Sequence, residues 1–446
     1  MDAGADRAPL KSALRKAQWR ILPLMALCYL VAYMDRTNIS FAAESMNRDL
    51  HFSAHVYGLG AGLFFVSYAL CEVPSNRLLL RFGARRWLAR ILATWGVVAM
   101  AMMFVRSRPS FYGVRLLLGV AEAGYFPGAL YYLSLWFPSA WRARAISWFY
   151  MSLPLSTVVM GAAAGTLLRL DGHLGLHGWQ WLFVVEGVPA VVLGLCLWFT
   201  LPDNPDAAGW LDATERAKLR SELESERCTE EDESTSTLLG RVLREPRVWW
   251  LSAFVFCIYG PAYAVAFFLP EITGKLMHIT PGRVGFLIAL AGLAGAAAMV
   301  VLAISSDRTG DRRWHVMIPA GIIAGLSLFA GLNLHGPAAA IALLLTVPVY
   351  MAFQGPLMTL LTEACRGKAA ALAIATINMC GIVGGFVGPY WMGWMRDLTG
   401  GYAAGIGWLS APWMISVACI GWVTRPRRQV AMERSVGLVA ATEKSL

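Results

Sequence analysis

The chain has 446 residues, of which 57% are hydrophobic and only 15% are charged, and its formal net charge is +10. Ordinary soluble domains carry roughly 25% charged residues, so a globule of this size would lack the polar surface that water requires. The composition therefore excludes a soluble enzyme, and its 52 aromatic residues exclude a disordered chain. It predicts a polytopic membrane protein.

The hydrophobic residues fall into long, continuous blocks. A helix needs about 20 mostly apolar residues to cross the hydrocarbon core, and only helices and closed barrels satisfy their backbone there. Because the blocks are continuous, we expect an all-α fold with twelve transmembrane helices. In chain order they are predicted at 20–43, 56–79, 86–105, 110–137, 143–168, 179–201, 248–273, 282–304, 315–334, 337–362, 369–394 and 403–424.

The positions of the basic residues predict how these spans are threaded. Cytoplasmic loops of membrane proteins carry an excess of lysine and arginine. With both termini in the cytoplasm, the inner segments hold 29 of the 38 basic residues, the outer loops hold seven, and Arg36 and Arg115 fall inside helices. We expect a multi-pass protein of a bacterial-type inner membrane. The positive net charge of the chain is explained by this topology and by attraction to anionic lipid, so no nucleic-acid partner is expected.

A polar stretch at residues 202–246 divides the spans into two groups of six. We expect residues 1–201 to form an N-terminal half and residues 247–446 a C-terminal half with a cytoplasmic tail. The two halves would form a monomer, with the polar stretch as a cytoplasmic tether between them.

Within this stretch, one short surface helix is predicted. Asp212 and Glu215 have the spacing of a capping box, and Leu219 and Leu223 follow at helical spacing. The segment 229–237 is predicted to be flexible.

Two features recur at corresponding positions of the halves. Glycine pairs lie at Gly161 and Gly165 in the fifth span and at Gly381 and Gly385 in the eleventh, and a basic turn follows the second span of each half. Small residues four apart permit close helix contact, and duplicated six-helix units are typical of alternating-access carriers. We expect the turns to be cytoplasmic gating motifs, formed by Gly83, Arg85, Asp307, Arg308, Gly310 and Arg312.

Four ionisable side chains fall deep inside predicted spans. Asp35 and Arg36 lie in the first span, and Arg115 and Glu122 lie seven residues apart on one face of the fourth. A charge at the bilayer centre costs about 2.5–3.5 kcal/mol on insertion scales, so such groups normally face a cavity or a partner. They predict a polar cavity in the first half. The alternative is that they form buried ion pairs that only fix helix contacts.

The residue types predict what this cavity binds. A guanidinium is permanently charged and holds a carboxylate through paired hydrogen bonds, so Arg36 or Arg115 can bind an anion. A poorly solvated carboxyl beside an arginine can exchange a proton as substrate arrives. We therefore predict proton-coupled transport of a small organic acid, with Asp35 and Glu122 as the proton carriers.

Other polar residues and one proline are also expected to have positions or roles within the helical bundle. Glu186 and Glu271 fall near the outer ends of spans, where solvated or gating roles are expected. Pro127 is predicted to bend the fourth span. The second half has no comparable charge before Glu363 at its cytoplasmic end, and it is expected to supply neutral hydrogen-bonding groups from Tyr259, Tyr263, Gln354, Thr359, Thr376 and Asn378.

The sequence predicts no metal or other cofactor. The eight cysteines show no Cys-x-x-Cys spacing, and the two histidine pairs at helical spacing lack a third ligand. Motifs for a nucleophile elbow or a phosphate loop are also missing, so a membrane enzyme is not expected.

Four segments of the chain resemble the major facilitator superfamily and, within it, the anion:cation symporter family. They are Tyr33–Ala42, Arg115–Pro127, Tyr131–Pro138 and Gly384–Tyr390, and the resemblance extends from about Trp19 to Arg425. The stretch from Leu201 through Leu211 looks like the branch that contains tartrate and aromatic-acid permeases.

This resemblance implies proton symport of an organic anion. Asp35 and Glu122 would be the proton-linked acids, and Arg36 would contact the carboxylate. The resemblance further implies that the pocket is completed by Tyr33, Tyr68 and Asn378, and that Arg115 pairs with an acid.

The chain also departs from the family pattern. Leu80 stands where an acidic residue is expected before Arg81, and Gln354 stands where a tryptophan is frequent. The fifth span offers Ser152, Leu153 and Pro154 where sugar-acid carriers offer an amide. These departures disfavour a polyhydroxylated sugar acid and leave an aromatic or a short dicarboxylic acid open. The competing hypothesis is an exporter or facilitator of a neutral or cationic small molecule.

Overall fold

The computed structural model describes residues 8–227, 235–365 and 370–423, and every regular element in these ranges is a helix. Ten of the helical segments are long and apolar enough to cross a membrane, and a bent pair makes an eleventh. A second interrupted pair occupies the predicted fourth span. The all-α fold expected from the sequence is thereby confirmed.

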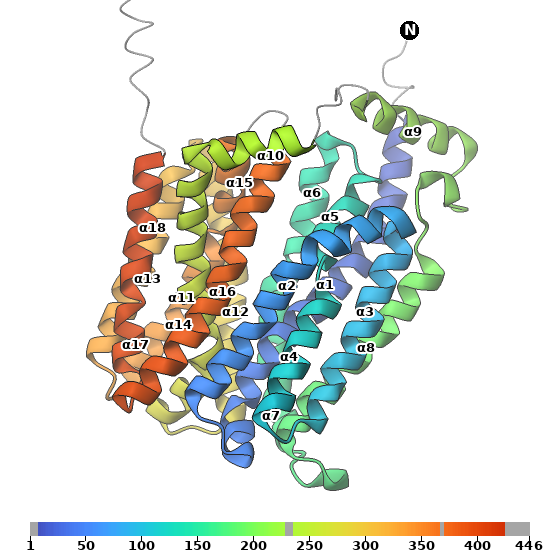
Figure 1. The fold of residues 1–446 in the computed structure, drawn as a ribbon. Coiled ribbons are helices and arrows are strands. Elements are labelled where there is room, and N and C mark those ends of the chain that lie inside the picture. The colour runs from blue at the N-terminus through green and yellow to red at the C-terminus, as the bar shows by residue number, and fades with distance from the viewer. Residues whose placement is uncertain (1–7, 228–234, 366–369, 424–446) are drawn as a thin grey trace, which may run out of the picture.

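The helices are arranged in two bundles (Figure 1). The first contains α1 (Ala8–Leu50), α2 (Ala54–Phe82), α3 (Ala84–Ala101), α4 (Arg108–Glu122), α5 (Tyr125–Ser134), α6 (Ser139–Tyr150), α7 (Ser152–Leu168) and α8 (Gly178–Thr200). The linker carries α9 (Ala213–Arg227) and α10 (Thr235–Arg244). The second bundle contains α11 (Pro246–Met277), α12 (Pro281–Thr309), α13 (Arg313–Leu332), α14 (Pro337–Ala352), α15 (Gln354–Ala364), α16 (Ala370–Thr399), α17 (Ala403–Trp408) and α18 (Ser410–Val423). Three short 3₁₀ turns are η1 (Met102–Phe104), η2 (His173–Gly175) and η3 (Pro205–Ala207).

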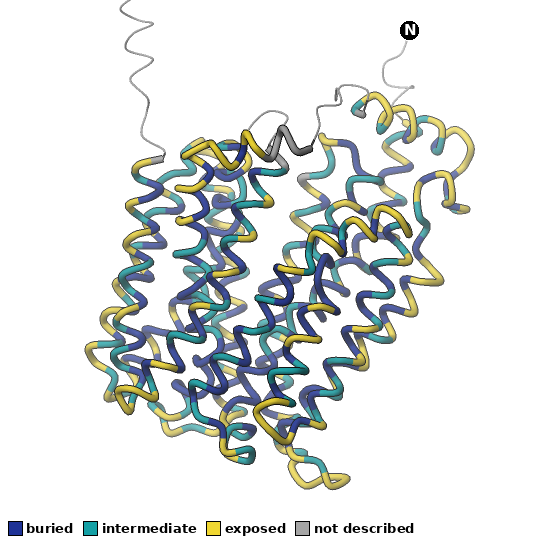
Figure 2. Tube along the Cα trace, viewed as in Figure 1, coloured by how far each residue is buried: buried dark blue, intermediate teal, exposed yellow. Residues whose placement is uncertain are grey.

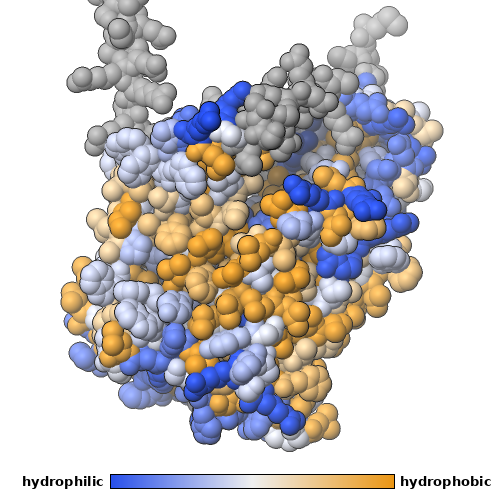
Figure 3. All heavy atoms as spheres, in the orientation of Figure 1, coloured by the Kyte–Doolittle hydropathy of each residue, from blue (hydrophilic) through white to orange (hydrophobic). Residues whose placement is uncertain are grey.

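The outer surface of the bundles is apolar over its middle. Figure 3 shows hydrophobic residues gathered across the central part of the face in view, with hydrophilic residues toward both ends. Large side chains such as Leu117, Phe286 and Leu293 are exposed on the described chain, whereas the interior residues are buried (Figure 2). A wide apolar exterior of this kind is the surface that lipid tails cover.

The predicted fourth span is broken, but not at Pro127. Helix α4 ends at Glu122, and α5 begins at Tyr125 after Gly124, whose φ of +84° is left-handed. Pro127 lies in the first turn of α5, where a helix does not need its missing N–H. The prediction of a proline bend is therefore wrong in its cause, because glycine at a left-handed position interrupts the helix instead.

The two bundles pack against each other at the end opposite α9 and α10. Helix α2 packs on α16, and α7 packs on α12. Gly58 lies against the backbone of Pro389, and Gly161 lies against the backbone of Gly285. The backbone N–H of His55 donates to Asp397 Oδ2 at 3.0 Å. These glycines therefore bring helix backbones from the two halves into direct contact.

The bundles separate toward the end that carries α9 and α10 (Figure 1). No residue of α2 from Ala54 to Ala69 is exposed, whereas Leu70, Val73 and Leu80 are 69%, 55% and 64% exposed. The same helix is thus covered along one half of its length and uncovered along the other.

The linker forms the helix that the capping box predicts. Glu215 N–H donates to Asp212 Oδ1 at 2.7 Å, and Asp212 N–H donates to Glu215 Oε2 at 3.1 Å, so both arms of the box are present. Leu219 on α9 is fully buried. Within the segment predicted to be flexible, residues 235–237 belong to α10, and 229–234 lie outside the described residues.

Helix α9 is docked on the first bundle through its acidic residues. Glu215 accepts hydrogen bonds from Lys16 Nζ at 2.7 Å and Ser12 Oγ at 2.6 Å, and Glu226 accepts one from the backbone N–H of Ser139 at 2.8 Å. Burial raises the pKa of Glu215, but the hydrogen bonds from Lys16 and Ser12 outweigh it, so the pKa lies below its ordinary value. The α9 interface thus depends on an ionised carboxylate.

We predict that replacing Gly161 by alanine destabilises the contact between the halves. A Cβ atom there would lie 2.5 Å from the Gly285 carbonyl oxygen and 2.9 Å from the Ala289 nitrogen. Overpacking of this kind costs about 1–3 kcal/mol, so the Gly161→Ala variant should melt at a lower temperature in detergent. The control is Gly325→Ala on α13, where a Cβ meets nothing within 4 Å. Equal melting temperatures for the two variants would contradict this packing argument.

We predict that Glu215→Gln releases α9 from the first bundle at neutral pH. Hydrogen bonds to charged groups contribute about 1.5–3 kcal/mol, so amide exchange in α9 should become at least about tenfold faster. In the native chain, a lowered carboxyl pKa stabilises docking above the ordinary value of about 4.3, and this stabilisation is lost as pH falls through the lower, folded-state pKa. Hydrogen-exchange mass spectrometry, corrected for intrinsic rates, measures both effects. Glu222→Gln, which alters an exposed α9 carboxyl, should exchange like the native chain.

Candidate functional site

A cavity of about 120 Å³ lies between the two bundles. On the first bundle its lining includes Tyr33, Arg36 and Ser40 of α1, and on the second it includes Tyr263 of α11 and Tyr350 of α14. The cavity is therefore formed jointly by both halves, and Arg36 is the one charged residue that the described part of the chain contributes to its lining.

Arg36 is held by Glu122 from the neighbouring helix α4. Its Nε and Nη2 atoms both donate to Glu122 Oε1, at 2.9 Å and 2.5 Å. The Glu122 side chain is fully buried, whereas 18% of the Arg36 side chain is exposed. Glu122 Oε2 is buried and has no partner among the described residues. The pair thus presents its cation toward the cavity and keeps its anion behind, with one carboxylate oxygen unsatisfied.

Aromatic rings surround the Arg36 guanidinium. Its carbon lies 5.1 Å from the ring centroid of Tyr68, 5.6 Å from that of Phe64 and 5.9 Å from that of Tyr33. Cations are attracted to the faces of such rings within about 6 Å. These side chains restrict where the guanidinium can point, because they exclude water and limit its rotamers.

Arg115 occupies a different position from the predicted one. It is 1% exposed, and its Nε and Nη2 atoms donate to the backbone carbonyls of Gly60 at 3.3 Å and Ala61 at 3.2 Å on α2. The hydrogen-bonded partner of Glu122 is Arg36, from another helix. The resemblance implies an unspecified acid as the partner of Arg115, whereas the hydrogen bonds found for Arg115 in the described chain go to backbone carbonyls of α2.

Asp35 points away from the cavity into the first bundle. It is 2% exposed, and Asn38 Nδ2 donates to its Oδ1 at 3.3 Å, while its Oδ2 has no partner in the described chain. The prediction that all four charges line one cavity is therefore too broad. Arg36 lines it, Glu122 lies directly behind Arg36, and Asp35 and Arg115 are enclosed among helices.

Glu186 on α8 is buried, which contradicts a solvated position and leaves the expected gating role as a prediction. It is 3% exposed, and both of its carboxyl oxygens lack a hydrogen-bond partner within the described residues. Helix α8, which carries Glu186, packs against α1, which carries Asp35 and Asn38. Glu271 belongs to a polar cluster at the end of the bundle opposite α10, with Lys275 Nζ at 2.6 Å and Arg396 Nη2 at 3.6 Å from its Oε1.

The structure separates the predicted substrate-binding residues into two groups. Tyr33 and Tyr263 line the cavity together with Arg36. Tyr68 is buried beneath the guanidinium, and Gln354, 7% exposed, begins α15 with its Nε2 buried and unpartnered in the described chain. Asn378 is half-buried on α16 and is not part of the cavity lining. Roles in substrate binding for these last three side chains remain predictions.

Several cavity residues were not singled out from the sequence as substrate contacts. Ser40 lies four residues after Arg36, and Tyr350 lies four residues after Thr346, so each pair shares a helix face that turns toward the cavity. Helical spacing from Arg36 would have indicated Ser40. No comparable charge marks Thr346 and Tyr350, because their relevance depends on how α14 is placed against α1.

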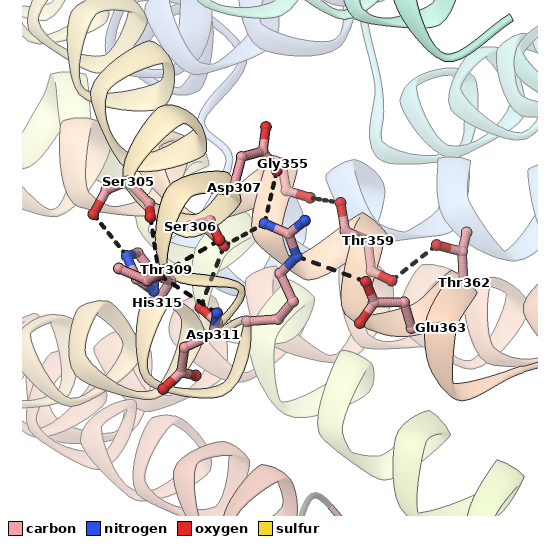
Figure 4. A network of polar contacts seen from close by, with 11 residues as sticks. Ser305, Ser306, Asp307, Thr309, Asp311, His315, Gly355, Thr359, Thr362 and Glu363 are labelled. Carbon is pink, nitrogen blue, oxygen red and sulfur yellow. Dashed lines mark hydrogen bonds and ion pairs between the residues drawn. The ribbon is translucent and has the colours of Figure 1, made fainter. Parts of the chain in front are cut away.

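The turns that follow α2 and α12 form ion pairs in both halves. In the second half, Arg312 Nη1 lies 2.7 Å from Asp307 Oδ1 and donates to Ser306 Oγ at 2.9 Å, and its Nε lies 3.7 Å from Glu363 Oε1 on α15 (Figure 4). Gly310 ends α12 in a left-handed conformation with φ +67°, and Arg308 is exposed.

In the first half, a different element supplies the acid. Arg85 Nη2 lies 3.1 Å from Asp203 Oδ2, which belongs to the segment after α8. Gly83 joins α2 to α3 with φ +86°. Asp203 thus gives this turn an ion pair, although Leu80 stands where the family pattern has an acid.

The sequence of the chain matches a known protein family and several named relatives. A sequence model of the Major Facilitator Superfamily matches residues 25–389. The chain is 44% identical to a putative tartrate transporter of Agrobacterium vitis, covering 88% of this chain and 90% of that protein. It is 38% identical to the putative metabolite transport protein NicT of Pseudomonas putida, covering 94% and 96%, and 38% identical to a quinolone resistance transporter of Acinetobacter baumannii, covering 90% and 92%.

Solved structures share the fold at low sequence identity. A bacterial homologue of the human lysosomal transporter Spinster, in an inward-facing, unoccupied conformation, has a TM-score of 0.75 at 16% identity and covers 92% of this chain and 97% of that one. The partially occluded, inward-open xylose transporter XylE from E. coli has a TM-score of 0.72 at 16% identity, covering 92% and 100%.

We predict that removing the cation at Arg36 destabilises the protein through Glu122. Breaking a buried ion pair by deleting one partner costs about 3–5 kcal/mol, because the remaining charge is left uncompensated. The Arg36→Met variant should therefore unfold at a clearly lower temperature, and Arg36→Met combined with Glu122→Gln should recover most of the loss. The control is Arg48→Met, whose side chain is 75% exposed and 3.7 Å from Asp49, and which should have little effect. A double variant no more stable than Arg36→Met would contradict the assignment.

Proposed function

Because the chain belongs to the major facilitator superfamily, we propose that it is a secondary transporter that moves a small organic carboxylate together with protons by alternating access. It would act as a monomer in a bacterial-type inner membrane, with both termini in the cytoplasm. The observation that carries the proposal is the Arg36–Glu122 pair at the wall of the cavity between the halves.

The pair suggests how substrate and proton are coupled. A substrate carboxylate that enters the cavity competes with Glu122 for the same guanidinium donors. Glu122 has no second partner in the described chain, so losing Arg36 leaves a buried anion without compensation. Burial of an unpaired carboxylate is costly, and uptake of a proton removes the charge. Substrate binding would thus bring a proton onto Glu122.

Asp35 is proposed as a second proton carrier. It is buried on the opposite side of α1 from the cavity, with one oxygen unpartnered in the described chain, and it is adjacent in sequence to Arg36. A movement of α1 that shifts Arg36 also moves Asp35. Protonation of Asp35 would therefore respond to the conformation of the first bundle rather than to contact with the substrate.

The packing of the halves supports alternating access. The bundles touch through glycines at the outer end, and the inner part of α2 is uncovered. The arrangement corresponds to a cavity that communicates with the cytoplasmic side. Opening to the other side would require separation of α2 from α16 and of α7 from α12, and the ion pairs at Arg85 and Arg312 would brace the cytoplasmic ends during that movement.

We predict that Glu122→Gln and Asp35→Asn abolish accumulation driven by a proton gradient. In proteoliposomes with an inward proton gradient, native protein should concentrate a labelled carboxylate, and each variant should lose at least about 90% of this accumulation because a neutral amide cannot carry a proton. Exchange of labelled for unlabelled substrate should survive in Glu122→Gln, since Arg36 remains.

Two results would contradict the proposal. Normal accumulation by both variants would exclude these acids as the proton carriers. Binding of a cationic or neutral compound, with no carboxylate bound and no effect of Arg36→Ala, would instead favour the exporter or facilitator. Glu222→Gln serves as the control, because it neutralises an exposed carboxyl far from the cavity.

A further inference from the structure

Helix α2 carries a carboxyl group that the proposed coupling does not use. Glu72 lies within the apolar span Ala54–Phe82, about 15 Å along the helix from its end at Phe82. It is half-buried, and it forms no hydrogen bond or ion pair with any other described residue. A charged side chain inside a span costs about 2.5–3.5 kcal/mol, so a carboxyl that makes no structural contact there is expected to have a function.

Glu72 continues the face of α2 that holds the Arg36 guanidinium. Phe64, Tyr68 and Glu72 follow one another at intervals of four residues, so they form one stripe on the helix. The rings of Phe64 and Tyr68 lie 5.6 Å and 5.1 Å from the guanidinium carbon of Arg36. Glu72 is thus one turn, about 6 Å along the axis, beyond a ring that covers Arg36.

Glu72 also borders the uncovered part of α2. Its sequence neighbours Leu70 and Val73 are 69% and 55% exposed, where the two bundles separate (Figure 1). The Glu122 side chain, in contrast, is fully buried behind Arg36. Glu72 is therefore placed between the buried ion pair and the water that enters from this end.

This position provides a route for the proton that Glu122 exchanges. The Glu122 side chain has no exposed surface, and Arg36, which covers it, is permanently charged and cannot pass a proton on. We propose that Glu72 is a proton relay, through which Glu122 exchanges its proton with water on the cytoplasmic side. The relay rests on the proposed proton-coupled transport and gives the path of the proton within it.

The relay consumes no other reactant. On release, the O–H bond of the Glu122 carboxyl breaks, and an O–H bond forms on the Glu72 carboxylate. Glu122 is then an anion again and re-forms its pair with Arg36, while Glu72 loses the proton to water. The Tyr68 hydroxyl, one turn from Glu72 and beside Arg36, both donates and accepts hydrogen bonds, so it can bridge the gap between the two carboxyls.

Among the described residues, no other carboxyl is placed to do this. Helices α1, α3, α4, α5 and α16 pack against α2. Inside their spans, the charged side chains are Asp35 and Arg36 of α1 and Arg115 and Glu122 of α4. Arg115 donates to backbone carbonyls and Asp35 is enclosed among helices, so neither connects Glu122 with water. The tyrosines of α1 and α5 stay neutral near pH 7. The other charged groups of these helices lie near helix ends, and they are Lys11, Arg15, Lys16, Arg20, Glu44, Arg48 and Asp49 on α1, Arg85, Arg86 and Arg90 on α3, Arg108 on α4, and Arg396 and Asp397 on α16.

The test measures the amount and the rate of proton uptake separately. Full-length protein in lipid nanodiscs is mixed in a stopped-flow instrument with tartrate or benzoate, in weak buffer that contains a pH indicator. The native chain should take up protons as the acid binds. Glu72→Gln should take up the same amount at least about tenfold more slowly, because proton transfer by a positioned side chain contributes about 10²–10⁴-fold.

Two further variants separate a relay from a fixed negative charge. Glu72→Asp keeps the carboxyl, and Glu72→His replaces it by a group that carries protons near pH 7 without a negative charge. Both should take up protons within about threefold of the native rate, because each can still accept and donate a proton. The matched control is Glu44→Gln, which removes an exposed carboxyl near the opposite end of the first bundle and should change neither the amount nor the rate.

The outcomes distinguish the relay from the proposed function. A native rate in Glu72→Gln excludes the relay and leaves proton-coupled transport standing. A smaller amount of protons taken up by Glu72→Gln also contradicts it, because Glu72 would then hold the transported proton itself. If Glu72→His is as slow as Glu72→Gln, the position requires a negative charge and the relay is wrong. Absence of proton uptake by the native chain with both acids overturns the proposed coupling, and the relay with it.

Discussion

The ion pair between Arg36 of α1 and Glu122 of α4 is the interaction on which the site depends. Two charges in a medium of low polarity are tolerated because they neutralise each other at hydrogen-bonding distance and because aromatic rings surround the cation. The pair is nevertheless incomplete, since Glu122 Oε2 has no partner within the described chain. An incomplete buried pair is one that an incoming carboxylate can rearrange, whereas a fully satisfied pair would only hold helices together.

The polar side chains of the first bundle differ in whether all their hydrogen-bonding atoms have partners. Arg115 donates hydrogen bonds to two backbone carbonyls of α2 and thereby connects α4 to α2. Asp35, Asn38 and Glu186 form a second polar group inside the first bundle, away from the cavity, with four carboxyl and amide oxygens that lack partners in the described chain. Among the described residues, the buried ionisable side chains near the cavity thus belong to the first half, and the second half contributes aliphatic side chains, four aromatic rings and the Thr346 hydroxyl to the cavity lining.

Outside the cavity, the two helical bundles contact each other mainly where α2 packs on α16 and where α7 packs on α12. Glycines on α2, α7, α12 and α16 allow backbones of the two halves to touch, and aromatic side chains such as Tyr57 and Phe65 pack across the same interface. The described parts of the linker follow the same division, because α9 packs on α1 and α10 packs on α11 and α16. The turns after α2 and α12 also have ion pairs within their own halves, made by Asp203 in the first half and by Asp307 in the second.

Composition, hydropathy and basic-residue counts were sufficient to predict the helical membrane fold, because the bilayer leaves a chain few ways to satisfy its backbone. The capping box at Asp212 and the importance of Arg36 and Glu122 were likewise evident, since local spacing and rare intramembrane charges are properties of the sequence. The partner of Glu122, the burial of Glu186, the substitution of Asp203 for an acid at position 80 and the contribution of Thr346 and Tyr350 were decided only by tertiary structure. Each of these depends on which faces of distant helices meet, and helical periodicity within one span carries no information about its neighbours.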